Sequence, residues 1–258
     1  TSVLSARNSI KMIVCRHEGG AGFAAVADGR LRARSGVCIV SRGPGLANAM
    51  VAIHSAFHDA TPLVMLVGQV ERKDFGRGAL QEQNYSKLLG DITESVIEVN
   101  EPEQASEAIA RAFHIAESGT QGPVAVILPE DIFDEETDVE VNLPRPRALS
   151  GPRAQDLTQL ADMLAKAERP LIVVGGALLQ DALHEPDVFA NLQRFAETWM
   201  LPIHPTHRRP QLFDARHPNY GGYMGDFLVV RSVATLACMT KRRDFFANES
   251  VQALRILA

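Results

Sequence analysis

Two short groups of polar residues have the composition and spacing to carry chemistry. Glu18 follows the apolar stretch at residues 11–16, where burial would raise the pKa of a carboxyl and let it exchange protons near neutral pH. Gly43-Pro44-Gly45, with Asn48 one helical turn later, follows the next apolar stretch. Each group also has a purely structural interpretation. An acid in the first turn of a helix gains less than about 1 kcal/mol from the helix dipole, and glycine and proline suit any tight turn into a helix.

Short apolar runs alternate with longer amphipathic ones in the first half of the chain, and this alternation is typical of a parallel sheet flanked by helices. Residues 37–41 and 63–68 are continuously apolar, which predicts strands that are buried on both faces. The predicted strands cover residues 11–16, 36–41, 62–70, 96–99 and 123–128. The predicted helices cover residues 20–33, 46–57 and 102–117.

A change in composition divides the chain into two predicted domains. Residues 1–134 form the first α/β domain, and residues 135–153 read as a linker because they are first acidic and then rich in proline and arginine. Residues 154–258 form a second, partial Rossmann-like α/β domain with an atypical tail from about residue 226. Its predicted elements are helices at 154–167 and 188–199 and strands at 170–176 and 201–206.

The overall composition argues against several classes of protein. With 46% hydrophobic and 22% charged residues and a formal charge of −5, the chain can build cores but has no basic surplus for nucleic acid. It contains no apolar run near the roughly 20 residues of a membrane span and no secretory signal pattern, so we expect a cytoplasmic protein. Cys15, Cys38 and Cys238 lack metal-ligand spacing and are expected to be buried, inert thiols.

The order of these motifs resembles one family. His17-Glu18, then Ala-Asp-Gly-Arg one helix later, Gly-Pro-Gly with Asn48, and Gly68-Gln69 together resemble the pyrimidine-binding domain of thiamine diphosphate (ThDP) enzymes such as acetolactate synthase, pyruvate oxidase and benzoylformate decarboxylase. The resemblance covers about residues 12–133, and weaker motifs in the second half resemble the central domain of the same family. It implies a ThDP pyrimidine-binding fold followed by part of that central domain.

The resemblance also implies roles for four residues. Glu18 would hydrogen-bond the ring nitrogen of the cofactor's aminopyrimidine, so that the exocyclic nitrogen becomes the base that removes the C2 proton of the thiazolium ring. Pro44 and Asn48 would border the aminopyrimidine. Gln81 matches a family glutamine near the reacting centre, although Leu80 stands where the family has an aromatic residue. That departure leaves the substrate pocket undefined.

The family's diphosphate site has no counterpart in the sequence. Relatives hold the diphosphate through Mg²⁺ on a separate domain marked by Gly-Asp-Gly, and this chain contains no such motif. No metal ligand is therefore assigned to it, and because Thr1 is not a methionine we expect the chain to be a fragment. FAD is a candidate second cofactor, since Gly175-Gly176 follows a predicted strand and could approach a nucleotide phosphate.

Two functional hypotheses follow from the resemblance. In the first, the chain is the cofactor-activating part of a carboligase or decarboxylase of 2-oxo acids, similar to acetolactate synthase. It would then assemble as a homodimer or homotetramer, or with a separate diphosphate-binding chain. In the second, it is a non-catalytic α/β assembly or regulatory module derived from that family. The enzyme hypothesis is the preferred explanation of the origin of the chain. The second hypothesis is preferred for the behaviour of this chain when no diphosphate-binding domain is present.

Overall fold

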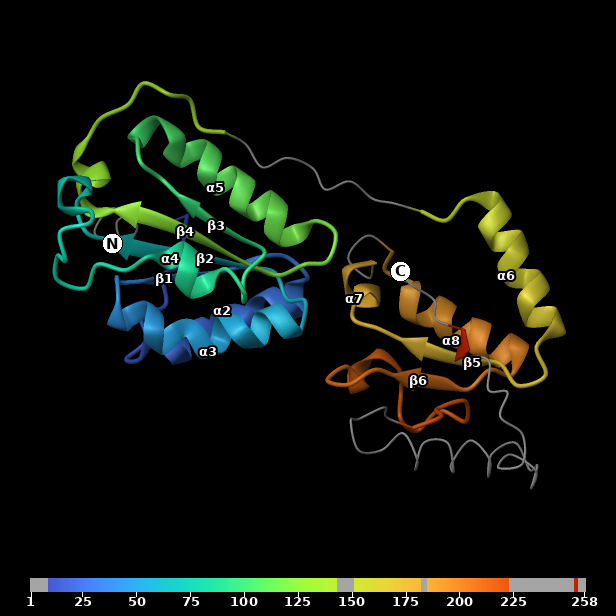
Figure 1. Cartoon of the computed structure of the whole chain (residues 1–258). Coiled ribbons are helices and arrows are strands. Elements are labelled where there is room, and N and C mark those ends of the chain that lie inside the picture. The colour runs from blue at the N-terminus through green and yellow to red at the C-terminus, as the bar shows by residue number, and fades with distance from the viewer. Residues whose placement is uncertain (1–8, 143–150, 182–184, 223–252, 255–258) are drawn as a thin grey trace. The chain divides into compact units, whose positions relative to one another are not determined.

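The computed structural model describes residues 9–142, 151–181, 185–222 and 253–254 (Figure 1). The chain divides into two compact units, Thr1–Ala148 and Leu149–Ala258. Each unit is a parallel sheet with helices packed against it, as the alternation of short and long apolar patterns predicts. The atypical tail from about residue 226 and Cys238 lie outside the described residues, apart from one two-residue strand at its far end.

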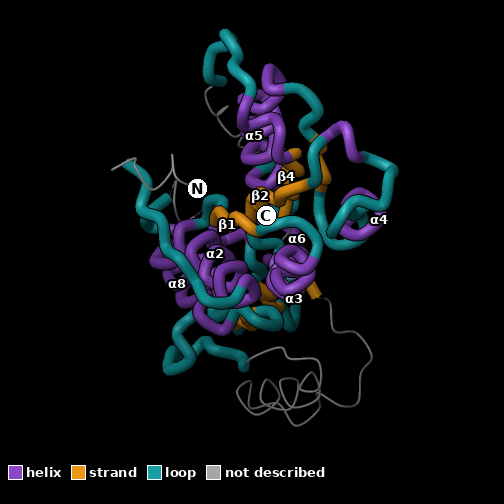
Figure 2. Tube along the Cα trace, turned by 90° about the vertical axis from the view of Figure 1, so that its left-hand side faces the viewer, coloured by secondary structure: helices purple, strands orange, loops and turns teal. Residues whose placement is uncertain are grey.

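The first unit is built on a four-stranded sheet in the order β1-β2-β4-β3, with every pairing parallel. Helices α2 and α3 cover one face and α5 covers the other (Figures 1 and 2). The strands are β1 (Gly36–Val40), β2 (Leu63–Gln69), β3 (Ser95–Glu98) and β4 (Pro123–Pro129). The helices are α2 (Glu18–Arg32), α3 (Pro44–His58), the short α4 (Tyr85–Leu89) and α5 (Pro102–Glu117). Two short 3-10 helices cover Arg72–Asp74 and Glu130–Asp134.

Local signals explain where the helices begin. The His17 side chain caps α2, because its Nδ1 accepts a hydrogen bond from the Gly19 N–H at 3.0 Å. Proline supplies a preset φ at the first position of α3 and of α5. Helices α2 and α3 approach closely at Gly22, where an added Cβ would lie 2.7 Å from the Ala52 Cβ. This close packing brings the first turn of α2 to the first turns of α3.

Two apolar clusters, one on each face of the sheet, hold the first unit together. All seven residues of β4 are buried, and β2 is buried except for two partly exposed positions. Continuous burial of this kind is what an interior strand of a parallel sheet requires. The prediction of a strand buried on both faces is therefore confirmed for β2.

Three expectations about the N-terminal region are wrong. Residues 11–16 are exposed and form no strand, since β1 pairs only with β2 and none of these residues joins a ladder among the described residues. Because β1 is an edge strand, Val37 and Ile39 on one of its faces are 47% and 45% exposed. Cys38 is buried as expected, but Cys15 lies in the exposed segment.

The second unit has a three-stranded parallel sheet in the order β6-β5-β7. Residues of α6, α7 and α8 join one apolar cluster with β5 and β6. The strands are β5 (Leu171–Val174), β6 (Ile203–Pro205) and β7 (Ala253–Leu254), and the helices are α6 (Ala154–Lys166), α7 (Ala177–Asp181) and α8 (Val188–Trp199). This arrangement agrees with the predicted second α/β domain, and the predicted limits of the two domains and the linker stay predictions.

Candidate functional site

The first turn of α2 places Glu18 next to α3. Its Oε2 accepts a hydrogen bond of 3.0 Å from the Nδ2 of Asn48, which lies in the second turn of α3. Glu18 is partly exposed and Asn48 is exposed. The side-by-side packing of the two helices therefore joins two of the predicted site residues, which stand 30 positions apart in the chain.

The turn before α3 lies against the other oxygen of the same carboxylate. Pro44 is the first residue of α3. A Cβ added to Gly45 would lie 3.6 Å from the Oε1 of Glu18 and 2.2 Å from the Oγ of Ser41. The Ser41 hydroxyl therefore occupies the space next to Gly45, and only glycine lets this turn pack against both Ser41 and the Glu18 carboxylate.

Gln81 reaches the same turn from the loop after β2. It has a left-handed backbone with φ of 66°, which is uncommon for a residue other than glycine. A Cβ added to Gly43 would lie 2.9 Å from the Cβ of Gln81. The structure therefore brings Glu18, Pro44, Asn48 and Gln81 together around the start of α3. The neighbouring Leu80 is 79% exposed, so this side of the site is open.

The expectation of a buried Glu18 carboxyl with a raised pKa is wrong for this chain. The backbone N–H at its own helix start and the Asn48 amide both stabilise the carboxylate, and together they lower the pKa of Glu18 against a weaker opposing effect of burial. The physical reason lies in the preceding segment, which is exposed and does not form the expected strand. Without that strand, desolvation of the carboxyl is too weak to outweigh these hydrogen bonds.

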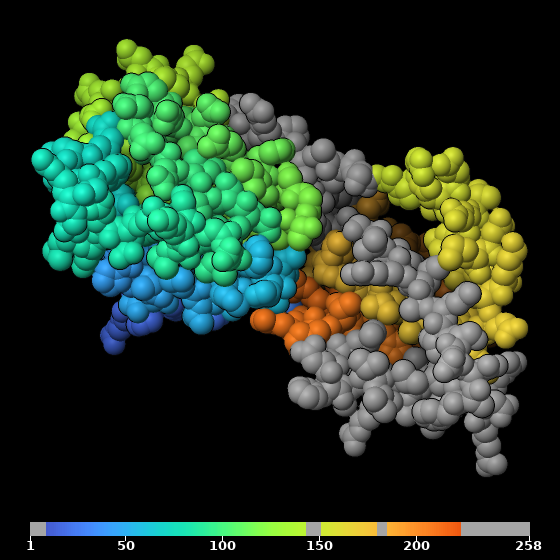
Figure 3. Space-filling view, in the orientation of Figure 1, coloured from blue at the N-terminus to red at the C-terminus, as the bar shows by residue number. Residues whose placement is uncertain are grey.

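The loop that carries Gln81 is closed by the carboxylate of Glu82. This side chain accepts hydrogen bonds from the N–H groups of Gly76 at 2.5 Å, Gly78 at 3.1 Å and Ala79 at 3.3 Å. Gly76 and Gly78 have φ of 74° and 69°, a conformation that suits glycine. Figure 3 shows this blue-green part of the chain on the surface of the first unit. The loop is thus locally ordered although it is exposed.

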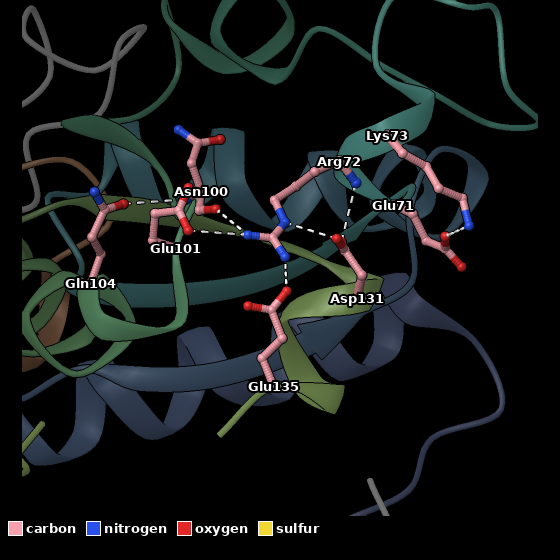
Figure 4. A network of polar contacts seen from close by, with 8 residues as sticks. All are labelled: Glu71, Arg72, Lys73, Asn100, Glu101, Gln104, Asp131 and Glu135. Atoms are coloured by element: carbon pink, nitrogen blue, oxygen red, sulfur yellow. Dashed lines mark hydrogen bonds and ion pairs between the residues drawn. The ribbon is translucent and has the colours of Figure 1, made fainter. Parts of the chain in front are cut away.

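One arginine ties the start of this loop to the end of the sheet. The Arg72 guanidinium donates to Asp131 Oδ2 at 2.8 Å and to the Asn100 carbonyl at 2.8 Å, and it also pairs with Glu101 and Glu135 (Figure 4). The Arg72 N–H donates to Asp131 Oδ1 at 3.1 Å. These groups follow β2, β3 and β4, so a single side chain joins the ends of three strands.

Tyr85 was missed by the sequence analysis. It is fully buried, and its hydroxyl accepts a hydrogen bond from the Gly43 N–H and donates one to the Gly68 carbonyl, both at 3.1 Å. Burial raises the pKa of this phenol, although the Gly43 hydrogen bond opposes the shift. The available signal was an aromatic residue four positions after Gln81 in an otherwise polar segment.

A cavity of about 450 Å³ lies at the carboxyl ends of β2, β3 and β4. Gln69, Phe75, Glu82, Glu98 and Pro129 are among its lining residues, and the four predicted site residues are not. Within the described ranges, no group of three or more His, Cys, Asp or Glu side chains is arranged to hold a metal ion. No described helix combines the length and apolar character needed to cross a membrane.

The glycine pair that suggested FAD lies at the carboxyl end of β5. An added Cβ on Gly176 would lie 2.6 Å from the Nε of Arg209, a buried residue that follows β6. The guanidinium therefore already occupies the space next to this glycine. FAD binding stays a prediction.

Comparisons with known proteins agree with the geometry. Residues 2–88 match the family model described as the thiamine pyrophosphate enzyme, N-terminal TPP binding domain, and residues 157–237 match the central domain of the same enzymes. A transglycosylase SLT domain model matches residues 217–258, which overlap the central-domain match and of which 217–222 and 253–254 are described.

Curated relatives include three acetolactate synthases. The chain is 32% identical to the large subunit of Corynebacterium glutamicum over 90% of its own length and 37% of the relative. It is 33% identical to a probable large subunit of Methanocaldococcus jannaschii over 83% of the chain and 36% of the relative. It is 30% identical to the acetolactate synthase of Arthrospira platensis over 84% of the chain and 38% of the relative. The chain spans a little over a third of the length of these relatives. Because of the two family-model matches and these identities, the chain belongs to the thiamine-diphosphate-dependent enzymes, in the part of that family that resembles acetolactate synthase.

Proposed function

We propose that this chain is the cofactor-activating part of a ThDP-dependent carboligase or decarboxylase that acts on 2-oxo acids. Glu18 is the proposed catalytic residue, and Pro44, Asn48 and Gln81 are the proposed cofactor-binding residues. The observation that carries the proposal is the Glu18 carboxylate, which accepts a hydrogen bond from Asn48 on one oxygen and lies beside the Gly45 turn with the other. A first-turn acid with only a helix-dipole role would not need this arrangement.

The residues around Gly45 fit the aminopyrimidine half of the cofactor. When bound, ThDP supplies a thiazolium carbon whose deprotonated form attacks the carbonyl group of the substrate. Glu18 would hold a proton between its carboxyl group and the pyrimidine ring nitrogen through Oε1, the oxygen that lies beside the Gly45 turn and does not bond Asn48. Asn48 would keep the carboxyl group in that orientation through Oε2. A pyrimidine packed over Glu18 would exclude water and raise the pKa of this carboxyl, in opposition to Asn48.

Diphosphate and Mg²⁺ binding are assigned in this proposal to a separate domain or chain, because the sequence contains no Gly-Asp-Gly motif. Three of the four site residues, Pro44, Asn48 and Gln81, are exposed in the first unit. A site of this kind needs a second protein surface to enclose the cofactor. A homodimer or homotetramer would supply it, and exposed apolar residues such as Phe23 (45%) and Val51 (57%) support association through α2 and α3.

The test uses Glu18→Gln in the chain combined with its diphosphate-binding domain. NMR measurement of proton exchange at C2 of bound ThDP is expected to show a loss of at least about a hundredfold. The matched control is Glu103→Gln, which removes an exposed acid from the first turn of α5 and should leave exchange unchanged. An exchange rate in Glu18→Gln within twofold of the parent would overturn the proposal.

Two further measurements address assembly and cofactor content. Light scattering on the purified chain should give a mass above that of one chain, and Val51→Lys should shift it toward the monomer if α3 lies in the contact. A strictly monomeric parent chain would contradict self-association. The absorption spectrum of the same sample tests FAD, since a flavin that copurifies would be visible directly.

A further inference from the structure

The turn that opens α3 has no cap of its own. Gly43 is the N-cap residue, with φ of 52° and ψ of −109°, and no side chain of the turn accepts a hydrogen bond from the first helical N–H groups. The local backbone bonds are those from Gly45 N–H to Arg42 and from Ala47 N–H to Gly43. Glycine adopts this conformation readily because it lacks a Cβ, so without a local cap the turn depends on contacts from elsewhere in the fold to hold one conformation.

Tyr85 supplies such a contact from α4. Its hydroxyl accepts from the Gly43 N–H and donates to the Gly68 carbonyl at the end of β2, so both hydrogen-bonding functions are used inside a fully buried site. A buried N–H left without a partner costs about 1–3 kcal/mol, so this bridge favours one conformation of the turn. It connects the end of the interior strand β2 to Gly43, the residue just before α3.

Two close approaches leave the turn little freedom to move away from the bridge. Gly43 packs on the backbone of Gln81, whose carbonyl oxygen would lie 3.2 Å from an added Cβ. On the other side, a Cβ added to Gly68 would lie 3.4 Å from the Arg42 nitrogen. The turn is therefore confined between the Gln81 loop and the end of β2, with the Tyr85 hydroxyl between them.

We propose that Tyr85 is a positioning residue for cofactor activation, an inference that rests on the proposed function of Glu18. Its hydroxyl fixes Gly43, and through this turn it sets the place of Gly45 opposite the Glu18 carboxylate and of Gln81 beside it. Tyr85 itself is fully buried, so in this proposal it acts through the turn and has no exposed surface that could contact the cofactor. Without the hydroxyl the chain still folds, but the distance between the turn and Glu18 is less narrowly fixed.

The first test uses the chain alone and needs no cofactor. In Tyr85→Phe, NMR hydrogen exchange at the Gly43 amide is expected to be about tenfold faster than in the parent. The matched control is Ser86→Ala, which removes a hydroxyl from the same helix but only its exposed bond to Glu98. Equal protection of Gly43 in parent and Tyr85→Phe overturns the bridge. If the variant does not fold, the parent chain is tested instead. A nuclear Overhauser effect between the Tyr85 hydroxyl proton and the Gly43 amide proton is then expected, and its absence overturns the inference.

The second test separates this inference from the proposed function. C2 proton exchange is measured in the assembled enzyme for Tyr85→Phe, Ser86→Ala and Glu18→Gln, at a temperature where all are folded. We expect a loss of about tenfold for Tyr85→Phe and none for Ser86→Ala, because displacement of catalytic groups by an ångström costs rate without loss of fold. If Glu18→Gln abolishes exchange and Tyr85→Phe leaves it within twofold, only the Tyr85 role is overturned. If Glu18→Gln leaves exchange unchanged, the proposed function is overturned and the Tyr85 role with it.

Discussion

The carboxylate of Glu18 accepts a hydrogen bond of 3.0 Å from the side-chain amide of Asn48. The bond crosses from the first turn of α2 to the second turn of α3 and fixes the orientation of an acid that lies beside the Gly45 turn. It also stabilises the ionised form of that acid, so the free chain holds Glu18 as a carboxylate.

This relationship predicts how the acid titrates. In Asn48→Leu, the pKa of Glu18 should rise, because the carboxylate loses a hydrogen-bond donor while its own backbone N–H remains. Carboxyl ¹³C NMR over an acid titration of the free chain measures the shift. Glu197 in the second unit, whose pKa is lowered by hydrogen bonds from Gln193 and His217, serves as the internal reference and should give the same curve in parent and variant. A Glu18 curve that does not move would show that Asn48 does not stabilise the charge.

The Arg72 network should contribute to the stability of the first unit. Arg72→Met removes donors from Asp131 and from the Asn100 carbonyl, and we expect the free energy of unfolding to fall by about 1–3 kcal/mol. The adjacent Lys73→Met removes only an exposed ion pair with Glu71 and should change the free energy by less than about 0.5 kcal/mol. Urea unfolding followed by circular dichroism compares them, and equal effects would contradict a special role for Arg72.

Two glycines should respond in opposite ways to alanine. Gly43→Ala is expected to destabilise the chain by about 1–3 kcal/mol, because φ is positive there and the new Cβ would meet Gln81 at 2.9 Å. Gly20→Ala should stabilise it by up to about 1 kcal/mol, since Gly20 lies inside α2 and an added Cβ would meet nothing within 4 Å. Calorimetry gives the change in melting temperature for each variant. A melting temperature of Gly43→Ala equal to that of the parent would contradict the close approach of Gly43 to Gln81.

The second unit should lose stability in mild acid. Burial lowers the pKa of His204 below its ordinary value, and the nearby backbone of Gly222 opposes the shift. The unfolded state therefore takes up a proton first as the pH falls through the ordinary histidine pKa, and stability decreases from there down to the lowered pKa. Trp199, the only tryptophan, reports unfolding of this unit by fluorescence. The unfolding midpoint should be lower at about pH 5.5 than at about pH 7.5, and His204→Leu should reduce that difference. An undiminished difference in the variant would exclude His204 as its source.

The two described cysteines should differ sharply in reactivity. Burial raises the pKa of the Cys38 thiol to about 11, whereas Cys15 is exposed. At about pH 8 the thiolate fraction of Cys38 is then on the order of one in a thousand, so labelling by a maleimide should be at least about a hundredfold slower at Cys38 than at Cys15. Mass spectrometry on a Cys238→Ser background follows both sites. Similar rates would mean that β1 opens in solution.

Local patterns were sufficient for most of the fold. The bounds of α5 and α8 agree with the predicted helices, and β2, β4 and β5 lie within or close to the predicted strands. These elements depend on the spacing of apolar residues and on proline at the helix start, which are properties of neighbouring positions. The order of motifs was likewise enough to identify the family and to select the four residues that meet at the start of α3.

By itself, the sequence determined most of the helices and strands, that the sheets are parallel, and the family to which the chain belongs. Only the tertiary structure decided that β1 is an edge strand, that residues 11–16 form no strand beside β1, and that the pKa of Glu18 is lowered. It also revealed the Tyr85 bridge to Gly43 and Gly68. The physical reason is that desolvation and hydrogen bonding depend on which distant segments come into contact, and the local spacing of residue types contains no such information.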